Sequence, residues 1–295
     1  MTDAYGAFVL SGLPPGRYRL LVRQIGYTPA DTGVTIRGDS DVSVRIELTH
    51  LAIELPPVTV TGRTTCSQPG PPDRRLTPAL AAVFDQLLEN ARRFELLADS
   101  HPFRFRHERT HRTVTLGADT VVAGVDSIEH ASEEEFKRYQ PGRVVDWGRG
   151  SFRDQRVVVL PALAHFADAT FIGHHCFRLA GRDTIAGETL VRIDFEPTAT
   201  LGSADLAGAA YLDSLTYQLR YTRVSLTRPE RALPGTVALL ATTRFREIAP
   251  GVVLHDHVYA VTTLPTPMRS SLPAQLIEEQ RLLSVRFLRP FFRER

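Results

Sequence analysis

The sequence is poor in cysteine and lysine and contains no long apolar run. Two cysteines, Cys66 and Cys176, are too few to hold a metal cluster by themselves, but they could form one disulfide in an oxidising compartment. No apolar run approaches the roughly 20 residues that a transmembrane helix needs, so no membrane-spanning helix is predicted. Lys137 is the only lysine among 35 basic residues, which we interpret as the bias of a GC-rich genome.

Several signatures of catalysis are also missing. The sequence has no glycine-rich phosphate loop after a strand, no G-x-S-x-G nucleophile elbow and no C-x-x-C pair. The formal net charge of +2 is small for 295 residues and gives no support to a nucleic-acid partner. We therefore expect a non-enzyme without a cofactor and without nucleic-acid binding.

The composition is that of a folded protein. Hydrophobic residues make up 43% of the chain and charged residues 23%, close to the averages for soluble globular proteins. A chain of 295 residues is long enough for two domains with separate cores.

The first 62 residues predict a β-sandwich of short strands. Apolar and polar side chains alternate in runs that turn residues separate at spacings of about ten residues. The strands are expected at 7–10, 18–22, 34–36, 42–48 and 58–60. We expect Gly6 and Gly16 to supply the positive φ of tight connections, and aromatic side chains to supply core bulk. The turn and core residues of this sandwich are predicted to be Gly6, Phe8, Pro14, Pro15, Gly16, Tyr18, Gly26 and Tyr27.

Three short segments in this region resemble a known family. Thr2–Phe8 (TDAYGAF), Gly12–Tyr18 (GLPPGRY) and Ile25–Tyr27 (IGY) are similar to the signature of carboxypeptidase-regulatory-like domains. The resemblance implies a transthyretin-like sandwich with a carbohydrate-binding-like fold, also found ahead of TonB-dependent outer-membrane receptors. It transfers no catalytic residue, because the zinc site of those enzymes lies in a separate domain. It implies an adaptor or stabilising role in the bacterial cell envelope.

The resemblance also bears on the start of the chain. In the family two further strands precede the Thr2-Asp3 turn, so we expect an N-terminally truncated, incomplete sandwich with an exposed edge. A truncated start would have lost its signal peptide. The expected location is therefore the periplasm, with possible association with the outer membrane.

A proline-rich linker and a long helix follow. Residues 63–77 contain Pro69-Gly70-Pro71-Pro72 and predict a semi-rigid linker. Thr77 is a good N-cap and Pro78 suits the first helical position, and apolar residues then recur every three or four positions. We therefore place domains at 1–62 and 78–288, with a tail at 289–295.

Residues 78–288 predict a mainly β domain with that one long helix packed on it. Segments such as His175–Phe177 and Asp205–Asp213 resemble a β-rich module of unknown function in bacterial envelope proteins, and the pattern resembles half-barrel folds of periplasmic lipoprotein carriers. Short helices are expected at 132–139 and 163–169. Strands are expected near 102–116, 118–126, 143–149, 156–160, 175–180, 189–195, 207–212, 216–227, 236–246, 252–263 and 281–288.

The string His107-Glu108-Arg109-Thr110-His111 matches the H-E-x-x-H zinc motif. In that motif both histidines share one face of a helix and the glutamate activates the bound water. Here aromatic and β-branched neighbours alternate with period two, which predicts a strand. On a strand the two imidazoles stand roughly 13 Å apart, too far for one zinc ion. A zinc hydrolase using His107, Glu108 and His111 is therefore only an alternative.

Other polar groups have simpler structural interpretations. His255 and His257 are expected on one strand face with a spacing that a metal could use, but no third ligand is evident. His174-His175-Cys176 alternates in direction along a strand, so a metal or nucleophile is disfavoured. A structural role for Cys176 is expected instead, either buried or in a disulfide with Cys66, and the disulfide is favoured if the protein is periplasmic. Trp147 is expected to be a packing residue. The carboxylates that we considered for acid–base work, and favour as turn caps, are Asp194, Glu196, Asp205 and Asp213.

These observations predict a non-catalytic binding or structural protein of the envelope. Its ligand would be a glycan, a peptide or another envelope protein, and exposed strand edges favour binding by β-augmentation. The alternatives are a periplasmic carrier of lipid or lipoprotein and the zinc hydrolase.

Overall fold

The computed structural model describes most of the chain and divides into two units, Met1–Ala52 and Ile53–Arg295. The described residues are 6–38, 41–53, 65–115, 120–136, 138–148, 156–265 and 273–289.

The first unit contains one two-stranded antiparallel sheet. Strand β1 (Gly16–Val22) pairs with β2 (Ala30–Ile36), and Arg19 forms an ion pair with Asp31 across it. Ile25 is the one hydrophobic residue that is fully buried among the described residues of this unit. The described part of this unit therefore has a thin core.

Two expectations for this unit are wrong. Residues 7–10 and 42–48 form no strand, because a strand needs a hydrogen-bonded partner and this part of the described chain offers only an isolated Tyr27–His50 bridge. Gly6 has the expected positive φ of 81°, whereas Gly16 lies in β1 without it; Gly12 and Gly26 adopt positive φ in addition (75° and 83°). Phe8 and Tyr18 are half-buried, and the Tyr18 hydroxyl donates to Pro14. The strand expected at 58–60 lies outside the described residues.

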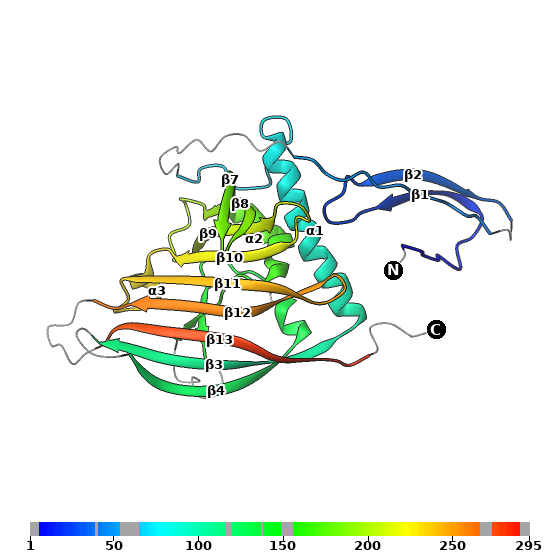
Figure 1. Ribbon diagram of the computed structural model, residues 1–295. Helices are drawn as coiled ribbons and strands as arrows, with labels where there is room; N and C mark the ends of the chain where they lie inside the picture. Colours follow the sequence, from blue (N-terminus) through cyan, green and yellow to red (C-terminus); the bar gives the residue numbers. More distant parts are fainter. Residues whose placement is uncertain are drawn as a thin grey trace. The chain divides into compact units, whose positions relative to one another are not determined.

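The second unit is built on a nine-stranded antiparallel sheet with the order β4-β3-β13-β12-β11-β10-β9-β8-β7 (Figure 1). Every predicted strand of this region is present, although β13 begins eight residues before the predicted start because its first half is less apolar. The strands are β3 (Phe103–Thr115), β4 (Val121–Ala131), β7 (His175–Ile185), β8 (Glu188–Pro197), β9 (Leu206–Asp213), β10 (Leu219–Leu226), β11 (Ala238–Ala249), β12 (Val252–Thr263) and β13 (Pro273–Phe287).

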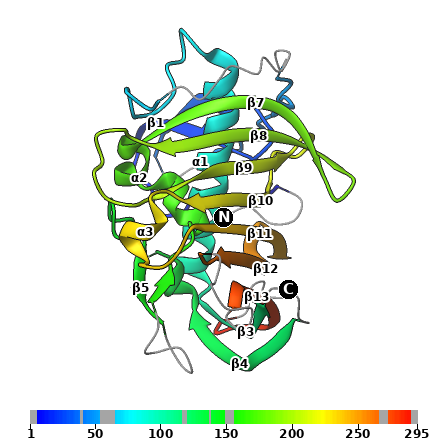
Figure 2. The same ribbon diagram turned by 90° about the vertical axis from the view of Figure 1, so that its left-hand side faces the viewer.

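The predicted long helix is α1 (Pro78–Ser100), which begins at the expected proline. It lies against one face of the sheet, which curves around it as a half-barrel (Figure 2). Aromatic rings make this contact: Phe84 meets Phe177 with ring centroids 4.6 Å apart, and Phe94 meets Phe103 at 6.5 Å. Thr77 is the N-cap by position, but its hydroxyl donates to the Asp73 carbonyl and accepts no hydrogen bond from the first turn of the helix.

A mixed segment between β4 and β7 covers one end of the sheet. It contains the 3-10 helices η1 (Ser132–Phe136) and η3 (Leu163–Ala167), near the two expected short helices. It also contains the strand pair β5 (Val145–Trp147) and β6 (Arg156–Val158). The helix α2 (Ala169–His174) ends this segment, and α3 (Pro229–Ala232) lies between β10 and β11. Neither helix was predicted, because six and four residues are too short to show helical periodicity.

A disulfide joins Cys66 to Cys176, the second residue of β7, with the Cα atoms 5.5 Å apart. Two backbone hydrogen bonds lie beside the disulfide: Gly70 N donates to His175 O, and Ala199 N donates to Cys66 O. Residues 65–77 are thus docked on the second unit. The first two residues of the predicted linker, 63–64, and the predicted boundary at residue 62 fall outside the described residues.

Among the described helices, none is long and apolar enough to cross a membrane.

Candidate ligand-binding site

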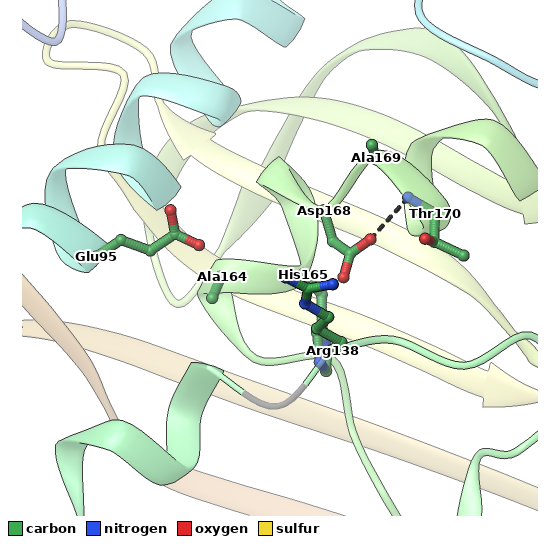
Figure 3. Close-up of a pocket in the computed structure, with 7 residues that line it drawn as sticks. All are labelled: Glu95, Arg138, Ala164, His165, Asp168, Ala169 and Thr170. Carbon is green, nitrogen blue, oxygen red and sulfur yellow. Dashed lines mark hydrogen bonds between the residues drawn. The ribbon is translucent and has the colours of Figure 1, made fainter.

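Two adjoining cavities lie beside η3 and α2 in the second unit. Their volumes are about 390 and 420 Å³, and Arg138 and His165 line both. The first cavity also has Glu95 from α1 and Asp168 at the start of α2 in its wall (Figure 3). The second is lined in addition by the apolar residues Val144, Val145, Val159, Pro161, Phe171 and Leu206 and by the polar residues Tyr139, Gln140, Arg143, Asp146 and Asp205.

Asp168 holds the wall of the first cavity in place. It is the N-cap of α2, where its carboxylate accepts hydrogen bonds from Thr170 N at 2.7 Å and Phe171 N at 3.3 Å. It also accepts one from Tyr139 N at 3.2 Å, which ties the segment after η1 to α2.

Glu95 faces the same cavity from α1, and its carboxylate points toward Ala164 and His165 in Figure 3. Burial raises the pKa of Glu95, and the negative charge of Asp168 adds to this effect while Arg92 opposes it. The cavity therefore holds one carboxyl group that gains a proton more readily than a free glutamate.

Asp205 anchors the second cavity. It is fully buried, and its carboxylate accepts hydrogen bonds from the Tyr139 hydroxyl, Gly142 N at 3.0 Å and Leu206 N at 2.8 Å. Burial and the hydrogen bond to Asp205 raise the pKa of Tyr139, so this hydroxyl stays protonated. The oxygens of Asp205 are thus engaged in holding the loop of Tyr139 and Gly142.

The two histidines near the cavities are also held by backbone atoms. His165 Nδ1 accepts from Ala162 N at 3.1 Å. His175 is fully buried, its ring stacks on Phe171 with centroids 4.0 Å apart, and its Nδ1 donates to Phe171 O at 2.8 Å. Burial lowers the pKa of His175. The two cavities thus present apolar side chains and arginines together.

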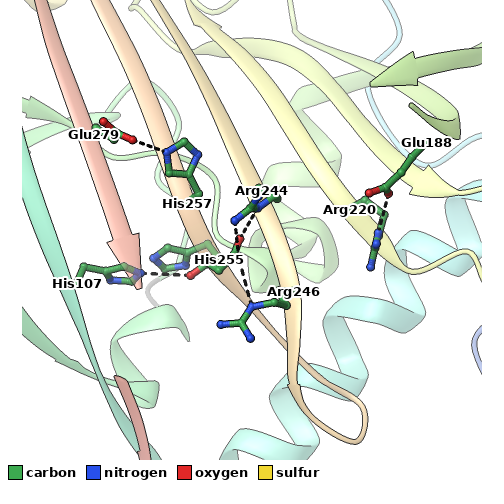
Figure 4. A network of polar contacts seen from close by, with 9 residues as sticks. His107, Glu188, Arg220, Arg244, Arg246, His255, His257 and Glu279 are labelled. Atoms are coloured by element: carbon green, nitrogen blue, oxygen red, sulfur yellow. Dashed lines mark hydrogen bonds and ion pairs between the residues drawn. The ribbon is translucent and has the colours of Figure 1, made fainter. Parts of the chain in front are cut away.

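The H-E-x-x-H string lies on β3, as its alternation predicts. His107 is fully buried toward α1, stacks on His255 with centroids 4.6 Å apart, and donates from Nε2 to the His255 carbonyl at 3.2 Å (Figure 4). His111 pairs instead with Glu278 of β13 and Gly124 of β4. The strand geometry therefore does not support the zinc hydrolase. No group of three or more His, Cys, Asp or Glu side chains in the described parts of the chain is arranged to hold a metal.

The prediction that His255 and His257 share a strand face is wrong. A β-bulge at Asp256 pairs His257 with Arg244 but His255 with Phe245, so the two rings point to opposite faces. His255 joins His107 near α1, and its Nδ1 lies 3.5 Å from a Glu135 oxygen. His257 Nε2 lies 2.9 Å from Glu279 on the other face (Figure 4).

The remaining candidate residues are dispersed. Asp194 pairs with Arg178 and Arg192. Asp213 caps the turn after β9, and hydrogen bonds from Thr216 N and Leu215 N lower its pKa although burial alone would raise it. Glu196 is exposed at the end of β8 and pairs in register with Cys176. Trp147 is 61% exposed on β5, with the Arg156 guanidinium over its ring.

Sequence reasoning missed the cavity residues Glu95, Arg138, His165 and Asp168. They come from α1, the segment after η1, η3 and the start of α2, and no spacing in the sequence links them. The one available signal was Asp168 two residues before Thr170, which is typical of a helix N-cap.

Comparison with known proteins shows a family match at the N-terminus. Residues 1–49 match the family model of the carboxypeptidase regulatory-like domain, which confirms the resemblance for that part of the chain. A search of the curated proteins found no match.

Solved structures show a distant likeness to part of the chain. A DUF1329 family protein from Desulfovibrio piger has a TM-score of 0.34 at 10% identity, covering 71% of this chain and 93% of its own. A LolA superfamily protein from Nitrosomonas europaea has a TM-score of 0.33 at 12% identity, covering 70% of this chain and 93% of its own. At these TM-scores the likeness assigns no function to the chain.

Proposed function

We propose that the chain is a non-catalytic binding protein of the bacterial cell envelope, whose second unit binds a small amphipathic ligand with an anionic group. The observation that carries this proposal is the pair of adjoining cavities around Arg138 and His165. Their volumes fall in the range of about 300–1,000 Å³ that is typical of ligand sites. Arg138 and Arg143 would contact the anionic group, and Val144, Phe171 and Leu206 the apolar part.

Two of the cavity carboxylates support a binding role. Asp168 and Asp205 use their oxygens for backbone and hydroxyl hydrogen bonds that hold the cavity walls. An acid–base catalyst needs an oxygen that can reach the substrate's proton. A peptide or a glycan that carries a carboxylate has the required chemistry.

An envelope location is supported by two features. The Cys66–Cys176 disulfide is typical of proteins in oxidising compartments, and residues 1–49 match the regulatory-like family. Binding of another envelope protein by β-augmentation would use the sheet edge at β4, where Val121, Val122 and Val125 are each more than half exposed.

The test uses 1-anilinonaphthalene-8-sulfonate, a fluorescent probe with apolar rings and one sulfonate. We expect saturable binding to the full chain, weakened about 10-fold by Arg138→Gln because a charge-assisted hydrogen bond is lost. Val159→Phe, which fills the second cavity, should abolish it. Arg182→Gln, an exposed arginine on β7, is the matched control and should bind normally. Unchanged binding in both cavity variants would contradict the proposal.

A carrier of lipid or lipoprotein is the second candidate. The apolar wall of the second cavity favours it, because an acyl chain could lie against Val144, Phe171 and Leu206. Native mass spectrometry of protein secreted to a bacterial periplasm distinguishes a lipid carrier from a binder of other ligands. A lipid bound to the wild type and absent from Val159→Phe would indicate the carrier.

A further inference from the structure

The sheet of the second unit has an outer face that points away from α1. Phe103 and Phe105 of β3 are buried on the α1 side, so alternation directs Arg104 and Arg106 to the outer face. Residues paired on adjacent antiparallel strands point to the same side, which allows this face to be followed across β4, β13, β12 and β11.

Arginine dominates this outer face. The outward arginines of these five strands, which we call the arginine face, are Arg104, Arg106, Arg112, Arg244, Arg246, Arg281 and Arg286. The same strands direct four carboxylates outward: Glu108, Glu129, Asp256 and Glu279. Seven against four leaves an excess of three positive charges, which exceeds the +2 of the whole chain. Positive charge is thus concentrated here.

Two of these carboxylates lie beneath the arginines. Asp256 is 8% exposed and bonds to Arg244 and Arg246. Glu279 is 8% exposed and bonds to Arg281, Arg112 and His257, and Figure 4 shows its contact with His257. The hydrogen bond from His257, helped by the guanidinium groups and opposed by burial, lowers the pKa of Glu279 to about 2. The guanidinium groups themselves are half or more exposed at Arg244, Arg246 and Arg281.

Apolar side chains occupy one end of the same face. Leu240 is 60% exposed and lies in register with Val261 and Ile277, and the next row carries Tyr259. On β4, Val122 lies at the end of the first row, beyond Arg112, and Val125 lies at the end of the second row, beyond Thr110. Isolated exposed apolar residues are ordinary, but Leu240, Val261 and Ile277 adjoin one another in one row of the face beside the arginines.

We propose that the arginine face docks on the surface of a bilayer that contains anionic phospholipids. Arginines would bind the phosphates, and Leu240, Tyr259, Val122 and Val125 would insert among the headgroups. A soluble polyanion would account for the arginines but would leave the apolar end unused. The face lies on the opposite side of the sheet from α1 and shares no residue with the cavities, so this proposal is independent of ligand binding in the cavities.

The experiment is sedimentation of the full chain with vesicles of equal phosphatidylglycerol and phosphatidylcholine. We expect binding that falls as salt rises and that is lost on pure phosphatidylcholine. Arg106→Gln with Arg286→Gln removes two exposed arginines outside the carboxylate clusters and should weaken binding about 25-fold, at about 5-fold per arginine. The double variant Arg75→Gln/Arg182→Gln makes the same charge change elsewhere and should bind nearly as the wild type.

A third variant tests the apolar end. Leu240→Ser with Val125→Ser should weaken vesicle binding while leaving binding to double-stranded DNA unchanged, and circular dichroism should show that every variant keeps its fold. The proposal would be overturned if Arg106→Gln/Arg286→Gln and Arg75→Gln/Arg182→Gln weakened vesicle binding equally. The proposal would also be overturned if the chain bound DNA as tightly as vesicles and Leu240→Ser/Val125→Ser left vesicle binding unchanged.

Discussion

At the scale of single residues, neighbours decide what a histidine does. His107 begins a zinc-like string, yet its Nε2 donates to the His255 carbonyl and its buried Nδ1 has no hydrogen-bond partner among the described residues. Burial, with help from nearby His255 and His130, lowers the pKa of His107 to about 3, although the hydrogen bond to the His255 carbonyl and the charge of Glu135 oppose this shift. His107 is therefore a neutral core ring.

This ring makes the stability of the second unit sensitive to acid. Unfolded, His107 takes up a proton near pH 6.5, whereas the folded protein resists protonation until about pH 3. The contribution of neutral His107 is therefore present above pH 6.5 and is lost as the pH falls toward 3. His107→Phe keeps an aromatic ring against His255, so urea unfolding should show a smaller loss of stability between pH 7.5 and 5 than in the wild type.

At pH 7.5 the same variant should lose about 1 kcal/mol, the value of one hydrogen bond. His174→Gln, at the end of α2, is the control and should keep the wild-type pH dependence. An unchanged pH dependence in His107→Phe would show that other groups, such as His130 and Glu135, are responsible.

At the scale of elements, Asn90 fastens α1 to the sheet. This residue is 3% exposed; its amide donates to Tyr217 O at 2.8 Å, and its carbonyl accepts from Leu219 N at 3.0 Å. Asn90 thereby satisfies one backbone carbonyl in the turn before β10 and the backbone N–H of Leu219, the first residue of β10. Aromatic contacts such as Phe84–Phe177 supply non-directional stability, whereas Asn90 sets the position of the helix along the sheet.

Replacing Asn90 by Ala should therefore cost more than a surface change on the same helix. Two buried backbone groups would lose their partners, for a loss of about 1–3 kcal/mol in the free energy of unfolding. Amide hydrogen exchange at Leu219 should quicken at the same time. Arg92→Ala, an exposed position two residues on, should change stability by about 0.5 kcal/mol or less. Equal losses of stability in Asn90→Ala and Arg92→Ala would contradict this role of Asn90.

At the scale of the whole molecule, the disulfide ties the segment before α1 to β7. Cys66 and Cys176 are 110 residues apart in sequence, so their bond closes a long loop in the unfolded chain. It holds this segment next to the backbone bonds at Gly70 and Ala199.

Removing this bond should destabilise the second unit. Cys66→Ser with Cys176→Ser is expected to lower the free energy of unfolding by about 3–5 kcal/mol, because the unfolded chain regains the entropy of an open loop. Chemical denaturation with and without reductant measures the effect. The wild type should respond to reductant and the double variant should not; a matching response in both would contradict the prediction.

The sequence by itself determined the strands of the second unit and α1, because alternation and three–four periodicity are local properties of long segments. It also determined that the H-E-x-x-H string is a strand. Only the tertiary structure decided that a bulge at Asp256 separates His255 from His257, since an extra residue in one strand reverses side-chain direction without any mark in composition. The cavity around Arg138 and His165 and the arginine face likewise come from pairing between distant segments, which strand register and helix packing alone bring together.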